Sequence, residues 1–374
     1  MKKILLFTYL QRHLKKMLPI IKEFEQNRDV IELTVLLMTE EEKGIAEANG
    51  ISYKMLDEYT RRQRSCDFDL AWGLEPLIKA IDLIQPDLFL CIEVNYILRN
   101  AVRYCKQTGI STMVVQHGTP NKYSLHAFTP FEADCFAAWG EFARELLVAN
   151  GVEKSKIQLT GGVHFDRTLK LTPDRHQIIQ ELNLDSDKKL ITFTTQAVGP
   201  GNCPSEEEII TGVVSVAEEM IKYGEYQLIY QVHPSQPVEY IKELVDSVEN
   251  STAVVVKYKN TEELMAASAG VITFFSTTAI DAVLMKKPLM LINLTDDRDF
   301  YPFVPMGVAF GAYDKKQIRK ALADLLFRAD GLEPNYARAQ MYMNYMNDGR
   351  ALERVMALIY KKLNIQERRG QEHG

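Results

Sequence analysis

The stretch PDLFLCIEVNYILRNAVRYCKQTGISTMVVQHG, residues 86–118, predicts a strand, a helix and a second strand. Its apolar runs, DLFLCIE and STMVVQ, lack polar alternation, which is typical of parallel strands buried on both faces. The segment between them, ILRNAVRYCKQTG, has a helical pattern that ends at Gly109. A strand, a crossover helix and a parallel strand are the repeating unit of α/β proteins.

The same alternation continues on both sides of this unit. Short apolar runs such as KKILLFT and IELTVLLMT precede it, and KKLITFTT, YQLIYQVHP, GVITFF and PLMLINL follow it, separated by helical patterns. We therefore predict an α/β protein with two Rossmann-like domains that face a cleft. The predicted domains span residues 1–166 and 167–347, and residues 348–374 form a tail, with a helix from Asp348, that packs back across them.

Composition excludes one broad class of partner. The chain has 44 basic and 50 acidic residues, a net charge of −6, whereas nonspecific nucleic-acid binding needs a basic surface, so we expect no nucleic-acid partner. Five cysteines without a CxxC pair indicate neither a disulfide framework nor a zinc site. No apolar run reaches the roughly 20 residues that span a bilayer. We therefore expect a cytoplasmic protein, with any contact at the inner face of the membrane being peripheral.

Polar residues follow the predicted strands of the first half, and ligands of open parallel sheets bind at the carboxyl ends of strands. The residues that follow STMVVQ are His117, Gly118, Thr119 and, three positions further, Lys122, and DLFLCIE ends at Glu93. Gly118 allows a tight turn, and Thr119 and Lys122 can contact a ligand. His117 or Glu93 can act as a general base. The alternatives are a turn histidine bonded to the backbone and a solvated strand-end carboxylate.

The second half carries a comparable set of residues. Pro234 favours extended backbone at His233, which follows a strand and can either donate to a phosphate oxygen or simply pack there. A hydroxyl-rich segment precedes the helix AIDAVLMKK; helix starts bind phosphate, although hydroxyls at these positions also serve as caps. The further candidates in this half are Thr195, Gln196, Ser276, Thr277, Thr278 and Asp281, the last of which can reach a ribose.

Four segments, taken together and in order, resemble a known family. They are QHGTPNK (116–122), LTGGVHFDR (159–167), VHP (232–234) and FFSTTAIDAVLMKKP (274–288). These segments are similar to the HGTPxK, G-x-x-x-FD, HP and serine-pair segments of CDP-glycerol glycerophosphotransferases of teichoic acid synthesis. The chain also resembles the wider group of GT-B type surface-polysaccharide transferases, including CMP-sugar glycosyltransferases, and it is related to UDP-GlcNAc 2-epimerases. Thr277 and Thr278, after Ser276, replace the family's paired serines.

The resemblance implies a GT-B fold and a glycosyltransferase that moves a sugar or a polyol phosphate from a nucleotide-activated donor, CMP- or CDP-linked. The acceptor is a hydroxyl of a bacterial surface glycan or glycolipid. The first domain holds the acceptor and supplies the base, His117 or Glu93, with Gly118, Thr119 and Lys122 on the acceptor side. The donor side consists of Thr195, Gln196, His233, Ser276, Thr277, Thr278 and Asp281. His233 neutralises charge on the leaving group. We expect no tightly bound cofactor and no metal, because histidine and a helix dipole take the cation's place.

Two other hypotheses stay open at this point. A UDP-sugar 2-epimerase or hydrolase with the same fold needs no acceptor site and turns over the donor alone. A noncatalytic scaffold of a glycan-assembly complex needs neither histidine. Sequence alone leaves open the base and sugar of the donor, the acceptor, the stereochemical outcome and the oligomeric state.

Overall fold

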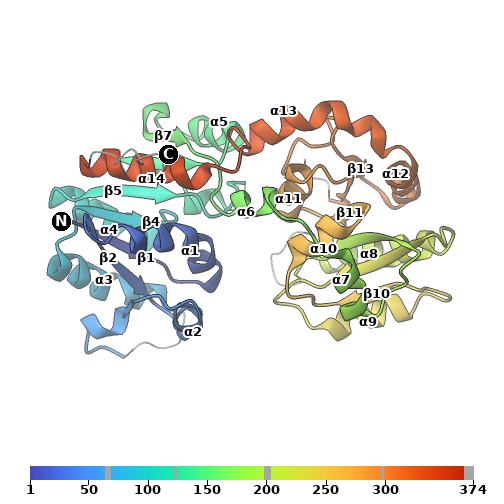
Figure 1. The fold of residues 1–374 in the computed structure, drawn as a ribbon, viewed down its shortest axis with the longest axis horizontal. Helices are drawn as coiled ribbons and strands as arrows, with labels where there is room; N and C mark the ends of the chain where they lie inside the picture. The colour runs from blue at the N-terminus through green and yellow to red at the C-terminus, as the bar shows by residue number, and fades with distance from the viewer. Residues whose placement is uncertain (64–68, 122–123, 198–203, 296–298, 366–374) are drawn as a thin grey trace, which may run out of the picture. The chain divides into compact units, whose positions relative to one another are not determined.

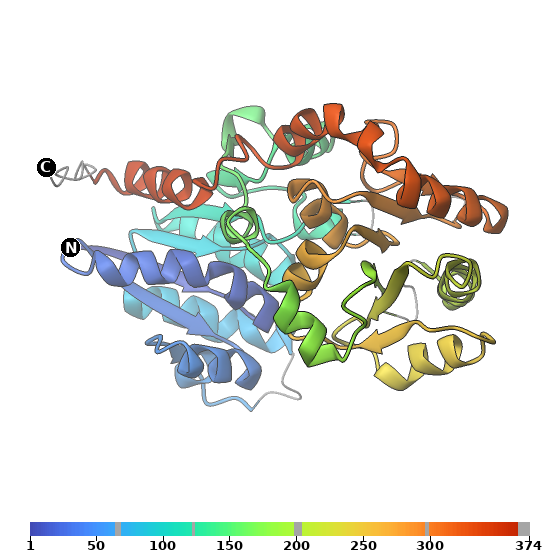
Figure 2. The same cartoon turned by 45° about the vertical axis from the view of Figure 1, so that its right-hand side comes forward.

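The computed structural model describes residues 1–63, 69–121, 124–197, 204–295 and 299–365. The chain divides into two compact units: unit 1 is Met1–Arg167 with Tyr342–Gly374, and unit 2 is Thr168–Met341. Each unit contains one parallel sheet, so the prediction of two Rossmann-like α/β domains is confirmed. Figure 2 shows each sheet from a second direction, with helices on both of its faces.

The sheet of unit 1 has seven parallel strands in the order β3-β2-β1-β4-β5-β6-β7 (Figure 1). The strands are β1 (Lys2–Phe7), β2 (Ile31–Leu37), β3 (Lys54–Met55), β4 (Leu88–Cys91), β5 (Ser111–Val115), β6 (Cys135–Ala138) and β7 (Ile157–Leu159). Every residue of β4 and β6 is buried. Because helices cover both faces of this sheet, β4 and β6 contain apolar residues at every position rather than at alternate ones.

The helices of unit 1 follow the strands in the alternation that the apolar runs predict. They are α1 (Gln11–Gln26), α2 (Glu40–Ala48), α3 (Leu70–Ile84), α4 (Tyr96–Gln107), α5 (Glu141–Ala149) and α14 (Ala351–Leu363), with short turns η1 (Leu56–Tyr59), η2 (Leu125–Ala127) and η3 (Lys154–Lys156). The helix α6 (Phe165–Leu169) contains the change from unit 1 to unit 2. The buried face of α1 is apolar apart from one histidine, His13, which lies in the first turn of the helix.

Unit 2 has six parallel strands in the order β10-β9-β8-β11-β12-β13. The strands are β8 (Lys189–Thr194), β9 (Tyr226–Gln231), β10 (Val254–Val256), β11 (Gly270–Thr273), β12 (Leu289–Ile292) and β13 (Phe310–Ala312). The helices are α7 (Arg175–Leu182), α8 (Glu206–Met220), α9 (Val238–Asp246), α10 (Thr261–Ala267), α11 (Thr278–Leu284), α12 (Lys315–Phe327) and α13 (Glu333–Met343), with the turn η4 (Ala329–Leu332). One apolar cluster includes α8, α9 and α12 and a second includes α7 and α10, so the sheet is covered on both faces.

The last helix, α14, red in Figure 1, packs into the core of unit 1 through Val355, Met356, Ile359 and Leu363. The helix begins at Ala351, three residues after the predicted start at Asp348, and its N-cap residue has no side-chain cap. Asp348 pairs with Arg354 instead.

The cap of α14 comes from a distant part of the chain, the FD segment of the sequence. The carboxylate of Asp166 accepts hydrogen bonds from the backbone N–H groups of Ala351 and Leu352, at 3.0 and 2.9 Å. Gly161, in the same segment, has φ +83, and a Cβ there would lie 2.9 Å from the Ala351 side chain. A carboxylate at a helix N-terminus satisfies free N–H groups and complements the helix dipole. The G-x-x-x-FD segment therefore attaches the returning chain to unit 1.

We expect Asp166→Ala to destabilise unit 1 by about 1–3 kcal/mol, because two N–H groups lose a charged acceptor. The chain's two tryptophans, Trp72 and Trp139, both belong to unit 1, so urea unfolding followed by tryptophan fluorescence reports on this unit alone. Asp57→Ala, which removes an exposed aspartate of the same unit, is the control and should leave the midpoint unchanged. Equal midpoints for both variants would show that Asp166 does not hold α14.

Two further findings bear on the sequence predictions. The described cysteines Cys91, Cys105 and Cys135 are free and buried. Among the described residues, no helix combines the length and the apolar character that crossing a bilayer requires.

Candidate active site

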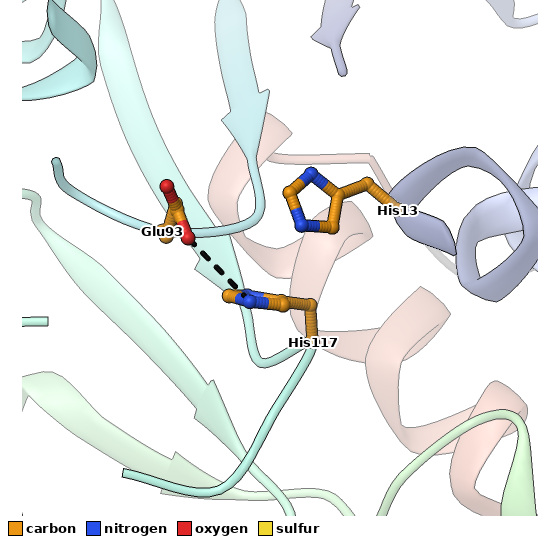
Figure 3. Close-up of side chains that lie close together, drawn as sticks. All are labelled: His13, Glu93 and His117. Carbon is orange, nitrogen blue, oxygen red and sulfur yellow. Dashed lines mark ion pairs between the residues drawn. The ribbon is translucent and has the colours of Figure 1, made fainter. Parts of the chain in front are cut away.

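Three neighbouring strands of unit 1 end at the same edge of the sheet and carry the chemically active groups. Tyr9 follows β1, Glu93 follows β4 and His117 follows β5. The first turn of α1 adds His13 from the side. Figure 3 shows the imidazoles of His13 and His117 and the carboxylate of Glu93 pointing toward a common centre. This edge lies beside the point where the strand order reverses, between β1 and β4, which is where ligands of doubly wound sheets bind.

The ring of His117 is held by its backbone surroundings. Its Nδ1 lies 2.9 Å from the carbonyl oxygen of Ile92, and because a carbonyl only accepts, Nδ1 carries the proton of the neutral ring. The lone pair is then on Nε2, which lies 3.4 Å from Oε2 of Glu93. Lys16 donates to the His117 carbonyl at 2.5 Å. His117 is therefore hydrogen-bonded to the backbone, which was the alternative to its role as a base. The two are compatible, because this bond leaves the lone pair of Nε2 available to accept a proton.

Glu93 is buried, with one oxygen bonded and the other facing His117. Its Oε1 accepts hydrogen bonds from the Tyr9 hydroxyl and from Nδ2 of Asn95, the latter at 2.8 Å. Burial raises the pKa of Glu93 to about 7, against a smaller lowering by the Asn95 hydrogen bond. Burial also lowers the pKa of His117 to about 4, with smaller contributions from the charges of Lys16 and Arg12 and an opposing one from the Ile92 carbonyl. The solvated strand-end carboxylate considered above is therefore excluded: Glu93 is 5% exposed.

The segment around His117 is fixed by Gln116. Nε2 of Gln116 donates to the Gly118 carbonyl at 2.9 Å, and its Oε1 accepts from the Trp139 backbone N–H at 2.7 Å. Gly118 does not have the positive φ that a glycine-requiring turn would need, and a Cβ there would meet no atom within 4 Å. The tight-turn argument for Gly118 was therefore wrong.

The other two acceptor-side candidates are Thr119 and Lys122, and the structure describes only Thr119. Thr119 is buried, and its hydroxyl has no hydrogen-bond partner among the described residues. Buried polar groups are nearly always paired, so an unpaired one indicates a missing ligand or water. Lys122 lies outside the described residues. The roles of Thr119 and Lys122 stay predictions.

In unit 2, Thr195 and Ser235 orient His233. The Thr195 hydroxyl accepts a hydrogen bond from the His233 backbone N–H at 3.0 Å. The backbone N–H of Ser235 donates to Nδ1 of His233 at 3.2 Å, and its hydroxyl lies 2.8 Å from the same atom. Because Nδ1 accepts, the proton of the neutral ring is on Nε2. His233 therefore presents an N–H donor on the side of the ring away from its own backbone.

The hydroxyls near the start of α11 divide into two groups. Thr278 lies in an internal network, with its Oγ1 2.9 Å from the Thr194 hydroxyl and 3.5 Å from that of Thr273. Ser276 accepts from the Thr278 N–H at 3.3 Å, and Thr277 is exposed. Thus Thr278 helps to join α11 to β8 and β11, and Thr277 is the candidate whose hydroxyl a ligand can reach from solvent.

The remaining donor-side candidates, Gln196 and Asp281, differ in their surroundings. Asp281 is 9% exposed and lies on the buried side of α11. Oε1 of Gln196 is buried and accepts no hydrogen bond from the described residues, as expected for a group that contacts a ligand. The binding roles of both residues stay predictions.

Sequence reasoning missed four residues of these regions. They are Tyr9, His13 and Asn95 in unit 1 and Gln236 in unit 2. Applying the strand-end rule to β1 would have found Tyr9, whereas His13 lies on the buried face of α1 among apolar residues, where its burial has an ordinary packing explanation. Both polar side-chain atoms of Gln236, three residues after His233, are buried without partners among the described residues. No sequence signal distinguishes this glutamine.

Two α/β units, each with one parallel sheet, are the architecture of GT-B type enzymes. The family model described as CDP-Glycerol:Poly(glycerophosphate) glycerophosphotransferase matches residues 146–361, more than half of the chain. The chain belongs to this family, so it is a transferase that uses a nucleotide-linked donor. The resemblance predicted from the four segments is confirmed. Three of these segments lie within the matched range, whereas QHGTPNK precedes it.

Solved structures share the fold over the full length. The S. aureus MnaA–UDP co-structure is 19% identical, covers 100% of both chains and has a TM-score of 0.70. A putative UDP-N-acetylglucosamine 2-epimerase from Listeria monocytogenes is 20% identical, covers 98% of both chains and has a TM-score of 0.72. A glycosyltransferase from Rickettsia africae is 13% identical, covers 98% of this chain and 99% of its own, and has a TM-score of 0.65. At these identities the likeness shows the fold alone. No curated protein matches the chain.

Proposed function

We propose that the protein transfers a polyol phosphate from a CDP-linked donor, such as CDP-glycerol, to a hydroxyl group of a surface glycan or glycolipid. The observation that carries the proposal is the pair formed by His117 and Glu93. A neutral imidazole with its lone pair on Nε2 can remove a proton from an alcohol. Membership of the glycerophosphotransferase family supports a cytidine nucleotide as the leaving group.

In the proposed reaction, the acceptor oxygen attacks the phosphorus that bears the polyol. A new oxygen–phosphorus bond forms, the bond from that phosphorus to the CMP oxygen breaks, and the hydroxyl proton passes to Nε2 of His117. Glu93 stabilises the imidazolium that results, since its Oε2 lies 3.4 Å from Nε2. Tyr9 and Asn95 hold the carboxylate through its other oxygen.

Unit 2 supplies the donor side of the proposal. His233 donates from Nε2 to the CMP phosphate, where negative charge develops as the bond breaks. Thr195 orients His233, because its hydroxyl oxygen accepts a hydrogen bond from the His233 N–H, and its O–H group can still donate to a diphosphate oxygen. Ser276 and Thr277, before α11, bind phosphate oxygens. Gln196, whose Oε1 is buried without a described partner, contacts the nucleotide.

The reaction should have a pH dependence set by the Glu93–His117 pair. Because its pKa is raised, the carboxyl group of Glu93 keeps its proton up to about pH 7. In the proposal this proton is donated from Oε2 of Glu93 to Nε2 of His117, so the lone pair of His117 is not available as a base. Activity should therefore rise with pH, with a midpoint near 7 in kcat/KM. In Glu93→Gln this limb should disappear, because a glutamine amide has no proton to lose in this pH range. A limb near pH 7 that persists in Glu93→Gln would contradict this assignment.

A second candidate, a UDP-sugar 2-epimerase, is favoured by one observation, the full-length likeness of fold to solved 2-epimerases. It predicts a different nucleotide and no need for an acceptor. A thermal-shift series with CMP, CDP, UMP, UDP, GDP and ADP separates the two. Ligand at about 100 times its Kd stabilises the native state by roughly 2.7 kcal/mol. We expect stabilisation by CMP and CDP. Stabilisation by UDP alone would overturn the cytidine proposal.

A further inference from the structure

We propose that His13, Glu93 and His117 of unit 1 form a binding site for one divalent transition-metal ion of the Zn²⁺ type. Each of the three residues offers one ligand atom, and these atoms all lie within 4.8 Å of one another. They come from three separate elements: the first turn of α1 and the chain just after β4 and β5 (Figure 3). The sequence pattern does not reveal this set, because its three members come from separate elements and His13 lies 80 positions before Glu93.

The distances suit such an ion. Zn²⁺ bonds to imidazole nitrogen and carboxylate oxygen are about 2.0–2.2 Å long, so two ligand atoms of a tetrahedral site lie roughly 3.3–3.5 Å apart. Nε2 of His117 and Oε2 of Glu93 are 3.4 Å apart. The His13 nitrogen lies within 4.8 Å of both and needs to approach by roughly 1.4 Å or less to complete a tetrahedral face.

The two ligands on strand ends already have the outer contacts that metal ligands usually have. Metal-binding histidines donate their second ring N–H to a carbonyl or carboxylate, which fixes the tautomer. His117 makes this bond to the Ile92 carbonyl. The Glu93 oxygen that faces away from His117 accepts from Tyr9 and Asn95. Both ligand atoms are therefore oriented before any ion binds.

His13 provides the independent observation. Its side chain is 0% exposed, and neither ring nitrogen has a hydrogen-bond partner among the described residues. Its only described ring neighbours are Tyr9 and His117, at centroid distances of 4.8 and 4.6 Å. Leaving a buried polar group unpaired is destabilising. A metal bond to one nitrogen would compensate for that cost.

The donor set selects the kind of ion. Two imidazoles and one carboxylate suit Zn²⁺ and its first-row neighbours, whereas Mg²⁺ and Ca²⁺ prefer oxygen ligands throughout. Burial lowers the pKa of His13 to about 2 and that of His117 to about 4, so both rings are neutral and able to bind metal at pH 7. The charges of Arg12 and Lys16, which contribute to both lowered pKa values, oppose a cation, and Glu93 supplies the compensating negative charge.

Zinc binding can be measured on the full chain without any nucleotide. The protein is stripped with EDTA, desalted and titrated with Zn²⁺ in competition with a chromogenic chelator. We expect one ion per chain, and we expect His13→Ala and His13→Gln each to weaken binding at least about tenfold, since loss of second-shell contacts alone costs 10–100-fold. Co²⁺ substitution should give visible absorption bands of a tetrahedral site that are absent from both variants.

Two controls keep the test decisive. His126→Ala removes an exposed histidine of the same unit and should leave the affinity unchanged. Tryptophan fluorescence in urea, recorded in EDTA, shows whether each His13 variant is folded, and the glutamine variant retains a polar side chain of similar length. Equal zinc affinity in the wild type and in folded His13→Gln would overturn the proposal, as would the absence of a bound ion in the wild type.

One consequence rests on the proposed function. An ion on Nε2 of His117 occupies the lone pair that removes the acceptor proton, so Zn²⁺ should inhibit transfer and EDTA should restore it. Binding that is lost in His13→Gln, together with unchanged turnover in saturating Zn²⁺, would uphold the metal site and contradict the role of His117 as the base. The two failures are therefore distinguishable.

Discussion

His117→Ala is expected to lower acceptor-dependent turnover of the donor by about 10²–10⁴-fold, the contribution typical of a positioned general base. The expectation follows from the placement of Nε2, whose lone pair is fixed by the Nδ1 bond to the Ile92 carbonyl. The loss should appear in kcat more than in KM, because the proton is transferred only as the new bond forms. Steady-state kinetics with CDP-glycerol and a hydroxyl acceptor measure it.

The matched control for this prediction is His126→Ala. His126 lies nine residues further along the chain, in the same unit, and is exposed. Its variant should retain wild-type kinetics. Nucleotide stabilisation of His117→Ala should also be unchanged, because we assign the nucleotide to unit 2. A turnover of His117→Ala within threefold of the wild type would show that the base is another group.

His233→Ala should lower kcat by about 10²–10³-fold, the usual effect of removing one donor to a developing anion. The Ser235 N–H to Nδ1 bond places the His233 proton on Nε2, where it can donate to the leaving CMP. His233→Gln keeps an N–H group at a similar distance from the backbone, so it should recover part of the loss.

The control in this unit is His176→Ala, which removes an exposed histidine on α7. It should be indistinguishable from the wild type. Equal losses in His233→Ala and His233→Gln, with normal folding, would indicate that the ring is needed for packing and not for its N–H group. Unchanged turnover in His233→Ala would remove the residue from the mechanism.

The fold could be predicted because several of its strands are nearly continuous apolar runs. Leu88–Cys91 and Leu289–Ile292 are buried throughout, and such runs between helical patterns have few alternatives to a parallel sheet. The start of α14 could not be predicted in the same way. Its cap is Asp166, 185 positions away from Ala351, and local rules look for a cap beside the helix.

The candidate site could be predicted only where it follows strand ends. His117 and Glu93 follow β5 and β4, and the structure brings them within 3.4 Å of each other. The sequence did not identify His13 as a site residue, because it lies on a helix among apolar residues, where core packing explains its burial equally well. Sequence also cannot separate a hydroxyl that binds a ligand from one that holds the fold together. The Thr278 hydroxyl bonds to that of Thr194 and the Thr195 hydroxyl accepts from the His233 N–H, whereas Thr277 is exposed.

The central claim is that the protein transfers a group from a cytidine nucleotide to a hydroxyl and uses His117 as the base. The most direct measurement is CMP release from CDP-glycerol, recorded with and without a polyol-phosphate or glycan acceptor, for the wild type and His117→Ala. The account predicts CMP release that depends on the acceptor and falls at least about 100-fold in the variant. Acceptor-independent conversion of UDP-GlcNAc, with CDP-glycerol left intact, would contradict it.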